Sequence, residues 1–407
     1  MRSGSMMPTE PSLPPTIDLE DLGLDHGAHL LIDRALRRVP VGDRLGVRGR
    51  DPALTVHLRA WARAHGHGFA ASDDGRTATL VRGAADSDRL AGAERAGGAD
   101  PGQVVARPAP TWGLAARGAL VESGGPVLHF DLEEKDLVWA DIAPRLYAQA
   151  AASQWDPASA IDWDAPFDLE PDVEAAVVQV MTYLVENEQV ALIVPARFLG
   201  RIHPHFREVL QVLAVQAADE ARHIEVFSRR AGLHGVPLGV SGAGGRASLT
   251  TLLQEPDFAL ASFLLSVLGE GTFLNLLGFL ETSAPDPVTR RVTHLARLDE
   301  SRHVAFGMAH LEHQLSLDAT LRSQLRAAVD RRHDALLETV GLNQQVFDAL
   351  VLLAAGAWTP GAIARGYAAV ERLQAEMDDG RQRRLVRLGF PPHEAAALSA
   401  LHTRNFM

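Results

Sequence analysis

The sequence predicts a mostly α-helical protein, in which a four-helix bundle with additional helices follows a small α/β domain. Strand-like and helix-like patterns alternate over residues 16–84, and long amphipathic segments dominate after residue 136. Between them lies a stretch rich in Ala, Gly, Asp and Arg that has no periodicity. The predicted division is therefore an α/β domain over 16–84, a linker and arm over 85–135, and a helical domain over 136–407.

The first domain has the predicted order βαβαββ. A helical apolar spacing at residues 30–36 precedes a strand-like run over 44–47, and a second helical stretch covers 54–65. Two short runs, 68–72 and 77–81, are joined by a Gly-containing turn, which is the pattern of a β-hairpin.

This domain resembles the small TusA/SirA-like sulfur-carrier fold through Leu22-Gly23-Leu24-Asp25, Val41-Gly42-Asp43-Arg44-Leu45 and Arg50-Asp51-Pro52. That family carries a Cys-Pro-x-Pro motif directly after its first strand, where this chain has His26-Gly27-Ala28-His29. The resemblance therefore implies a docking or structural domain that has lost persulfide transfer. His26 and His29 could instead be metal ligands, although exposed loop histidines are commoner.

Composition excludes several functions. The 39 basic and 51 acidic residues leave a net charge of −12, which argues against a nucleic-acid or anionic-membrane partner. With 0 cysteines there is no thiol nucleophile or thiolate metal site, so any metal must bind His, Asp or Glu. No run approaches the roughly 20 apolar residues of a membrane span, and the start has no apolar signal-peptide core, so we expect a soluble, cytoplasmic protein.

The helical domain contains five long amphipathic segments, and prolines lie between them, where they separate helices without breaking them. A Gly-rich stretch at 235–245 supplies a long connection between the second and third segments. One long crossover in a four-helix bundle is the ferritin-like topology. The segments cover 173–199, 206–231, 258–282, 287–317 and 319–353.

One pentapeptide occurs twice in these helices. Asp219-Glu220-Ala221-Arg222-His223 and Asp299-Glu300-Ser301-Arg302-His303 correspond position for position. Glu and His three residues apart lie on one face of a helix, so both can bind one metal ion. Two matching copies in apolar helices indicate an internal duplication that carries a metal site.

A dimetal bundle needs one further carboxylate from each of the other two helices. Glu270 lies on an apolar stripe of the third segment, and on the first segment Glu188 has apolar neighbours whereas Glu186 has polar ones. The predicted ligands are four carboxylates and two imidazoles, a set that suits two iron ions, with Mn/Fe as the alternative. They are Glu188, Glu220, His223, Glu270, Glu300 and His303. The structural alternative is a set of buried ion pairs with Arg222 and Arg302.

Two further groups of residues are predicted around the ligands. Asp219 and Asp299 are expected to accept the free ring N–H of the histidine in the opposite half, while Arg222 and Arg302 neutralise them; surface Asp–Arg pairs are the alternative. The predicted pocket wall is Leu184, Leu192, Gln216, Phe227, Phe273 and Leu274, for most of which ordinary core packing is the alternative. His294 and His310 are expected at the polar surface, with a role as metal ligand or proton relay as the alternative.

Over residues 136–317 the chain resembles bacterial multicomponent monooxygenase hydroxylases, within the ferritin-like di-iron carboxylate superfamily. The resemblance rests on the repeated D-E-x-R-H, on Gly269-Glu270-x-x-Phe273-x-Asn275 and on Gln154-Trp155-Asp156-Pro157. It implies that the six ligands hold two irons that activate O2. The chain departs from the hydroxylases at Leu274, where they have a threonine, and from radical-storing reductase subunits at Phe227, where those have a tyrosine.

The expected function is therefore an O2-activating non-heme di-iron oxygenase or oxidase. Its partners would be O2, a small apolar or aromatic organic substrate and an electron-donor reductase, and a homodimer is a candidate assembly. Two other functions stay open: an iron-storage or peroxide-handling protein, and a non-enzymatic sulfur-relay adaptor.

Overall fold

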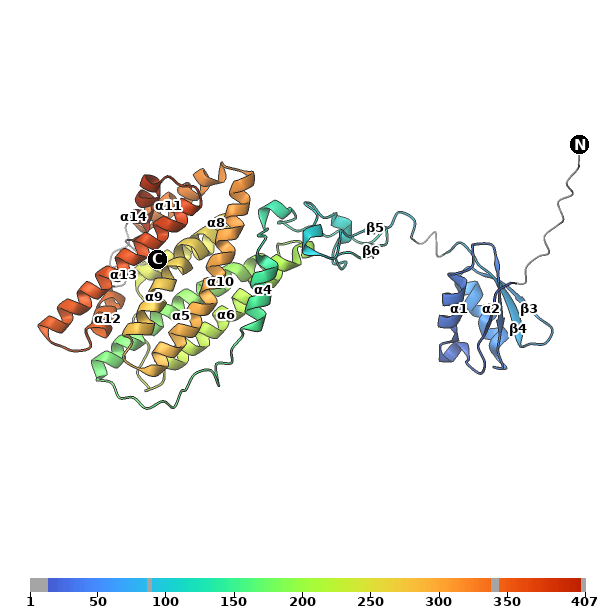
Figure 1. The fold of residues 1–407 in the computed structure, drawn as a ribbon, viewed down its shortest axis with the longest axis horizontal. Coiled ribbons are helices and arrows are strands. Elements are labelled where there is room, and N and C mark those ends of the chain that lie inside the picture. Colours follow the sequence, from blue (N-terminus) through green and yellow to red (C-terminus); the bar gives the residue numbers. More distant parts are fainter. Residues whose placement is uncertain (1–13, 86–89, 338–343, 404–407) are drawn as a thin grey trace, which may run out of the picture. The chain divides into compact units, whose positions relative to one another are not determined.

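The computed structural model describes residues 14–85, 90–337 and 344–403. The chain divides into two compact units, Met1–Arg95 with Leu120–Gly125, and Ala96–Ala119 with Pro126–Met407. The first unit is a small α/β fold and the second is helical, which confirms the predicted fold class (Figure 1).

The α/β unit has the predicted order βαβαββ. Its sheet has the order β1-β2-β4-β3, in which β1 runs parallel to β2 and the other pairs are antiparallel. One apolar face of α1 and α2 packs on the sheet, with Ile32, Leu58 and Leu80 fully buried. The elements are β1 Thr16–Asp18, α1 Ala28–Leu36, β2 Arg44–Arg48, α2 Leu54–Ala64, β3 Gly68–Ala71 and β4 Thr77–Val81. A separate pair, β5 Glu94–Arg95 and β6 Leu120–Val121, is antiparallel.

The stretch Leu22-Gly23-Leu24-Asp25, through which the domain resembles the sulfur carriers, lies after the first strand. The first strand ends at Asp18, and Leu24–His26 forms a 3-10 turn that ends at Gly27, whose φ of 103° favours glycine. His26 is exposed and pairs with Asp25. His26 therefore lies at the end of a helical turn after the first strand, and the resemblance to the sulfur carriers stays a prediction.

The helical unit is built around a four-helix bundle whose third member is a composite of α8, η6 and α9 (Figure 1). Its core is one continuous apolar cluster. The bundle helices are α5 Pro171–Leu199, α6 Arg207–Ala231, α8 Phe258–Ser262, η6 Phe263–Glu270, α9 Gly271–Ser283 and α10 Pro287–Leu317.

The third member of the bundle is the most apolar helix of the described chain. Residues Phe258–Ser283 have the length and hydropathy of a membrane span by composition, yet 78% of the relevant window is buried inside the protein. Burial in the bundle core accounts for this hydropathy. The prediction that no run approaches the length of a membrane span is wrong for this segment, in which Glu270 interrupts the apolar residues.

Further helices cover the bundle. In the described residues, α12 packs on α5 and α13 packs on α9, while α4 lies against α6 and α10. Of the predicted segment 319–353, the structure describes α11, which ends at Leu336, and α12, which begins at Gln344; residues 338–343 lie outside the described part of the chain. The additional helices are α4 Ala143–Ala152, α7 Ala243–Gln254, α11 Leu321–Leu336, α12 Gln344–Ala355, α13 Pro360–Arg387 and α14 Pro392–Thr403.

Two buried arginines form ion pairs that tie distant segments together. Arg230 on α6 is fully buried and donates to Glu174 on α5 at 2.7 and 2.8 Å and to Asp286 at the start of α10 at 3.0 Å. Arg117, in the segment predicted to be linker, donates to Glu208 on α6 at 2.7 Å, and both side chains are buried. Residues 96–119 therefore pack as part of the helical unit.

Candidate metal centre

The structure brings the six predicted ligands together at the centre of the bundle. One carboxylate comes from α5, one from the end of η6, and one Glu–His pair from each of α6 and α10, because the three-residue spacing places both side chains on the inner face. None is more than 4% exposed. Glu186, the alternative on α5, is half-buried and belongs to neither metal-ligand group.

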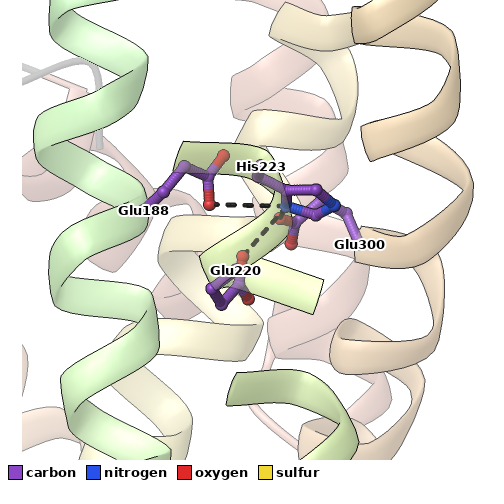
Figure 2. Close-up of side chains that lie close together, drawn as sticks. All are labelled: Glu188, Glu220, His223 and Glu300. Carbon is purple, nitrogen blue, oxygen red and sulfur yellow. Dashed lines mark hydrogen bonds and ion pairs between the residues drawn. The ribbon is translucent and has the colours of Figure 1, made fainter. Parts of the chain in front are cut away.

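The first half of the centre surrounds His223. Its Nδ1 lies 3.0 Å from Glu220 Oε2, 3.5 Å from Glu300 Oε1 and 3.7 Å from Glu188 Oε2. Figure 2 shows these four side chains converging from three helices. One ligand atom from each lies within 4.8 Å of the others, which is close enough for a single ion.

The second half surrounds His303. Its Nδ1 lies 3.0 Å from Glu220 Oε1 and 3.4 Å from Glu300 Oε2, and Glu270 completes this group within 4.8 Å. Glu220 and Glu300 thus offer one oxygen to each histidine. Two carboxylates shared in this way can bridge a pair of ions, with Glu188 and Glu270 as the end ligands.

The buried oxygens of this cluster fit a cationic occupant. Glu188 Oε1 and Glu270 Oε2 are buried with no hydrogen-bond partner among the described residues. Burying an unpaired carboxylate costs several kcal/mol, and a metal ion is one of the few groups that offset this cost. The donor set and its unpartnered atoms therefore fit two bound ions.

Ionisation in the metal-free protein is strongly perturbed. Burial, followed by repulsion from Glu220 and Glu300, raises the pKa of Glu188 well above its ordinary value. Burial and the Glu300 charge do the same to the pKa of Glu270. Against the effect of burial, the charge of His303 and hydrogen bonds from both histidines lower the pKa of Glu220. Glu220, which faces both histidines, therefore differs in protonation from the two end ligands.

The outer nitrogens of the histidines face the aspartates of the opposite half. His223 Nε2 lies 3.3 Å from Asp299 Oδ2, and His303 Nε2 lies 3.3 Å from Asp219 Oδ2. Each aspartate thereby favours the tautomer that leaves Nδ1 free toward the ion.

Two arginines neutralise the two aspartates. Arg222 donates to Asp219 and, at 3.0 Å, to Asp299. Arg302 donates to Asp299 and, at 3.4 Å, to Asp219. Each arginine therefore bridges the two halves, so the pairs are not surface contacts within one helix.

Three residues contact the site in ways that the sequence did not indicate. Trp155 Nε1 donates to Asp299 Oδ2 at 2.8 Å, and Gln154 Nε2 donates to Asp219 Oδ1 at 3.0 Å. Gln216, expected in the pocket wall, donates instead to Glu270 Oε1 at 2.8 Å. The only sequence signal for the first two was the Gln-Trp-Asp-Pro stretch at 154–157, between α4 and α5.

A small cavity of about 20 Å³ lies beside the end ligands Glu188 and Glu270. Of the predicted wall residues, only Phe273 lines it; Leu184, Leu192, Gln216, Phe227 and Leu274 do not. Two of the lining leucines come from α7, and patterns in the four bundle helices could not indicate that this helix takes part. The lining residues are Asn187, Glu188, Ala191, Leu249, Leu252, Leu265, Gly269, Glu270, Phe273 and Glu300.

The other histidines lie away from this centre. His294 is half-buried and pairs with Glu281 at 2.9 Å. His310 is fully buried, contrary to the expected surface position, because its ring packs on Phe258 and its Nδ1 donates to Trp139 O. His26 and His29 join no metal-ligand group among the described residues.

The fold and site together define a ferritin-like helical bundle with a buried carboxylate–histidine cluster able to bind two metal ions. No protein-family model matches the chain, and no curated protein is significantly similar in sequence.

Solved structures with some similarity are R2-like ligand-binding oxidases. One with an aerobically reconstituted Mn/Fe cofactor is 19% identical, with a TM-score of 0.45 over 61% of this chain and 93% of that one. A mutant with an aerobically reconstituted Fe/Fe cofactor is 19% identical, with a TM-score of 0.45 over 60% of this chain and 92% of that one. The protein from Sulfolobus acidocaldarius is 15% identical, with a TM-score of 0.39 over 62% of this chain and 93% of that one. Similarity at this level does not establish a shared family.

Proposed function

We propose that the protein is an O2-activating non-heme dimetal oxidoreductase that acts on a small apolar or aromatic substrate. The observation that carries the proposal is the pair Glu220 and Glu300, each with one oxygen toward His223 and one toward His303. Four carboxylates and two imidazoles form a hard, oxygen-rich set that suits Fe/Fe or Mn/Fe. When bound, two such ions would supply the electrons that reduce O2.

The chain's own residues would hold and tune these ions. Glu220 and Glu300 would bridge them, and Glu188 and Glu270 would bind one each. Asp219 and Asp299 would keep the histidine nitrogens correctly protonated, and their contacts to Arg222, Arg302 and the segment between α4 and α5 would hold the two halves in register.

The apolar side of the cavity supports the proposed substrate class. Leu249, Leu252, Leu265 and Phe273 offer no polar group beside the end ligands. Such a wall favours an apolar or aromatic substrate and keeps water from the metals.

More specifically, we propose that the protein inserts an oxygen atom into its substrate, on the basis of the resemblance to the monooxygenase hydroxylases. Those proteins use a threonine where this chain has Leu274. Thr272 does not replace it, because its hydroxyl donates to Leu268 O at 2.6 Å and is fully buried. Proton delivery would therefore involve a different group. Gln216 is a polar side chain that is hydrogen-bonded to the proposed ligand Glu270.

Insertion of one oxygen atom of O2 into a substrate needs two further electrons to reduce the other atom to water, so we propose an external reductase as partner. The α/β unit is the proposed docking domain. It has the βαβαββ order predicted for a domain that resembles the sulfur carriers, but the chain has no cysteine that could carry sulfur. Removing residues 1–89 leaves the packed segment that begins at Ala96 intact. Unchanged reductase-dependent turnover in this truncated protein would remove the docking role.

Metal content and the optical response to O2 test the proposal. The protein is loaded anaerobically with Fe(II), the bound iron is counted, and the visible spectrum is followed after O2 is admitted. Wild type and Glu186→Ala should bind two ions and give a transient band, and Glu220→Ala should do neither. Fewer than one ion per chain would favour the adaptor function, and many ions per chain would favour iron storage.

A further inference from the structure

The helix that carries Glu270 is irregular directly at that residue. Phe263–Glu270 is a π-helix, and the N–H of Gly271 bonds to Ser266 O, five residues earlier. In an α-helix the same N–H would bond to Val267 O, four residues earlier. Segments of π-helix are rare and often coincide with functional sites. The π-turn therefore needs another donor for the Val267 carbonyl.

Arg384 on α13 supplies that donor. Its Nε donates to Val267 O at 2.7 Å. Burial, followed by the charges of Arg381 and Arg383, lowers the pKa of Arg384 to about 10, so the guanidinium stays charged at neutral pH. A charged donor strengthens a hydrogen bond to a carbonyl in a buried setting.

The close approach of Arg384 depends on the glycine after Glu270. A Cβ at Gly271 would lie 2.5 Å from Arg384 Cζ, well inside van der Waals contact. Any side chain at this position would displace the guanidinium. The sequence Gly-Glu-Gly at 269–271 thus leaves room for the arginine beside the proposed ligand.

A second arginine of α13 holds the next carbonyl indirectly. Arg381 is 1% exposed, and its Nη1 donates to Thr272 Oγ1 at 3.3 Å. Thr272 in turn donates to Leu268 O at 2.6 Å. The carbonyls of Val267 and Leu268, three and two residues before Glu270, are therefore both bonded by side chains.

We propose that Arg384 is a positioning residue that holds the π-turn in the geometry in which Glu270 reaches the His303 half of the centre. This inference rests on the proposed dimetal function. Glu270 belongs only to the group around His303, whereas Glu188 belongs only to the group around His223. Loss of the Arg384 contact should therefore weaken one ion of the two.

Stepwise Mn(II) binding, followed by electron paramagnetic resonance, tests the proposal because a coupled ion pair differs from an isolated ion. Arg384→Met keeps the bulk of the side chain but removes the donor, and Arg384→Lys keeps a charged donor. We expect Arg384→Met to weaken the second ion at least about tenfold, the usual effect of losing an outer contact, while the first ion binds as in wild type. Arg384→Lys should recover most of the loss.

Two further variants control for packing. Arg383→Met, on the exposed side of α13 in an ion pair with Asp379, should bind both ions as wild type does. Gly271→Ala, which displaces the guanidinium while Arg384 stays in the sequence, should reproduce Arg384→Met. Circular dichroism establishes that each variant is folded.

The outcomes separate this inference from the proposed function. Two ions bound equally well by wild type, Arg384→Met and Gly271→Ala would overturn the positioning role alone. Equal weakening of both ions in Arg384→Met would also overturn it, since that result indicates general loosening of the bundle. A wild-type protein that binds fewer than two ions would overturn the proposed function and the inference with it.

Discussion

The indole of Trp155 donates to Asp299 at 2.8 Å from Nε1 to Oδ2, and the same oxygen lies 3.3 Å from His223 Nε2. A residue of the segment between α4 and α5 thus reaches a proposed metal ligand through one carboxylate. The guanidinium of Arg222 stacks over the same indole, 4.6 Å from its centre. This segment is therefore part of the site and not only a connection between helices.

Trp155→Phe should weaken the ion bound at His223 by about tenfold, because Asp299 loses a donor that orients it. An aromatic ring that can stack on Arg222 is kept, so the fold should be unaffected. Competition with a chelating dye measures the affinity. Trp163→Phe is the matched control, since the Trp163 indole donates to a backbone carbonyl, that of Pro157. Equal affinity in both variants would show that Asp299 is oriented without the indole.

Glu188→Gln should remove or weaken one ion, and Glu186→Gln should leave both in place. Glu188 is 2% exposed and faces His223, whereas Glu186, two residues earlier, points elsewhere on α5. Elemental analysis after gel filtration counts the ions that remain bound. The opposite result would mean that α5 presents a different face to the metals.

Arg230→Met should lower the free energy of unfolding by about 3–5 kcal/mol, the usual cost of leaving buried carboxylates without their cation. Glu174 and Asp286 both depend on this one guanidinium, which joins three bundle helices. Urea unfolding of the metal-free protein measures the loss. Arg229→Met changes the exposed neighbour and should cost much less; a comparable cost in that variant would contradict the assignment.

His310 should make the protein less stable in acid. Burial lowers its pKa from 6.5 to about 4, so the folded protein keeps it neutral while the unfolded chain takes up a proton below pH 6.5. Stability from this residue is therefore complete above pH 6.5 and is lost as the pH falls toward 4, by about 1.4 kcal/mol per pH unit.

His310→Gln should flatten that dependence. Between pH 7 and pH 5 wild type should lose about 2 kcal/mol more than the variant in urea unfolding, because the unfolded variant has one proton fewer to take up. His393→Gln, on an exposed position of α14, should follow wild type. Parallel curves for wild type and His310→Gln would show that the ring is protonated in the folded state.

Local periodicity explains what could be predicted of the site. The repeated D-E-x-R-H places Glu and His on one face of a helix whatever surrounds it, and the apolar neighbours of Glu188 and Glu270 set the inward faces of two more helices. These features need contacts only within one helix. For the same reason the order of the α/β unit and the bounds of α10 followed from residue patterns alone.

Long-range contacts explain which features of the site could not be predicted from the sequence. Trp155 and Asp299 are 144 positions apart, and nothing in either segment specifies the other. The cavity wall differs from the prediction because leucines of α7 line it. His310 lies in the core instead of at the expected surface because it contacts Trp139 and Phe258.

Residue patterns alone predicted the helical class, the duplicated motif and the candidate ligands, because helix periodicity and the chemistry of carboxylates and imidazoles are local properties. The folded structure was needed to show which oxygens face both histidines, which segments enclose the cluster, and that Arg384 replaces a backbone donor beside Glu270. These depend on the packing of segments far apart in the chain, where side-chain geometry and not residue pattern selects the partner.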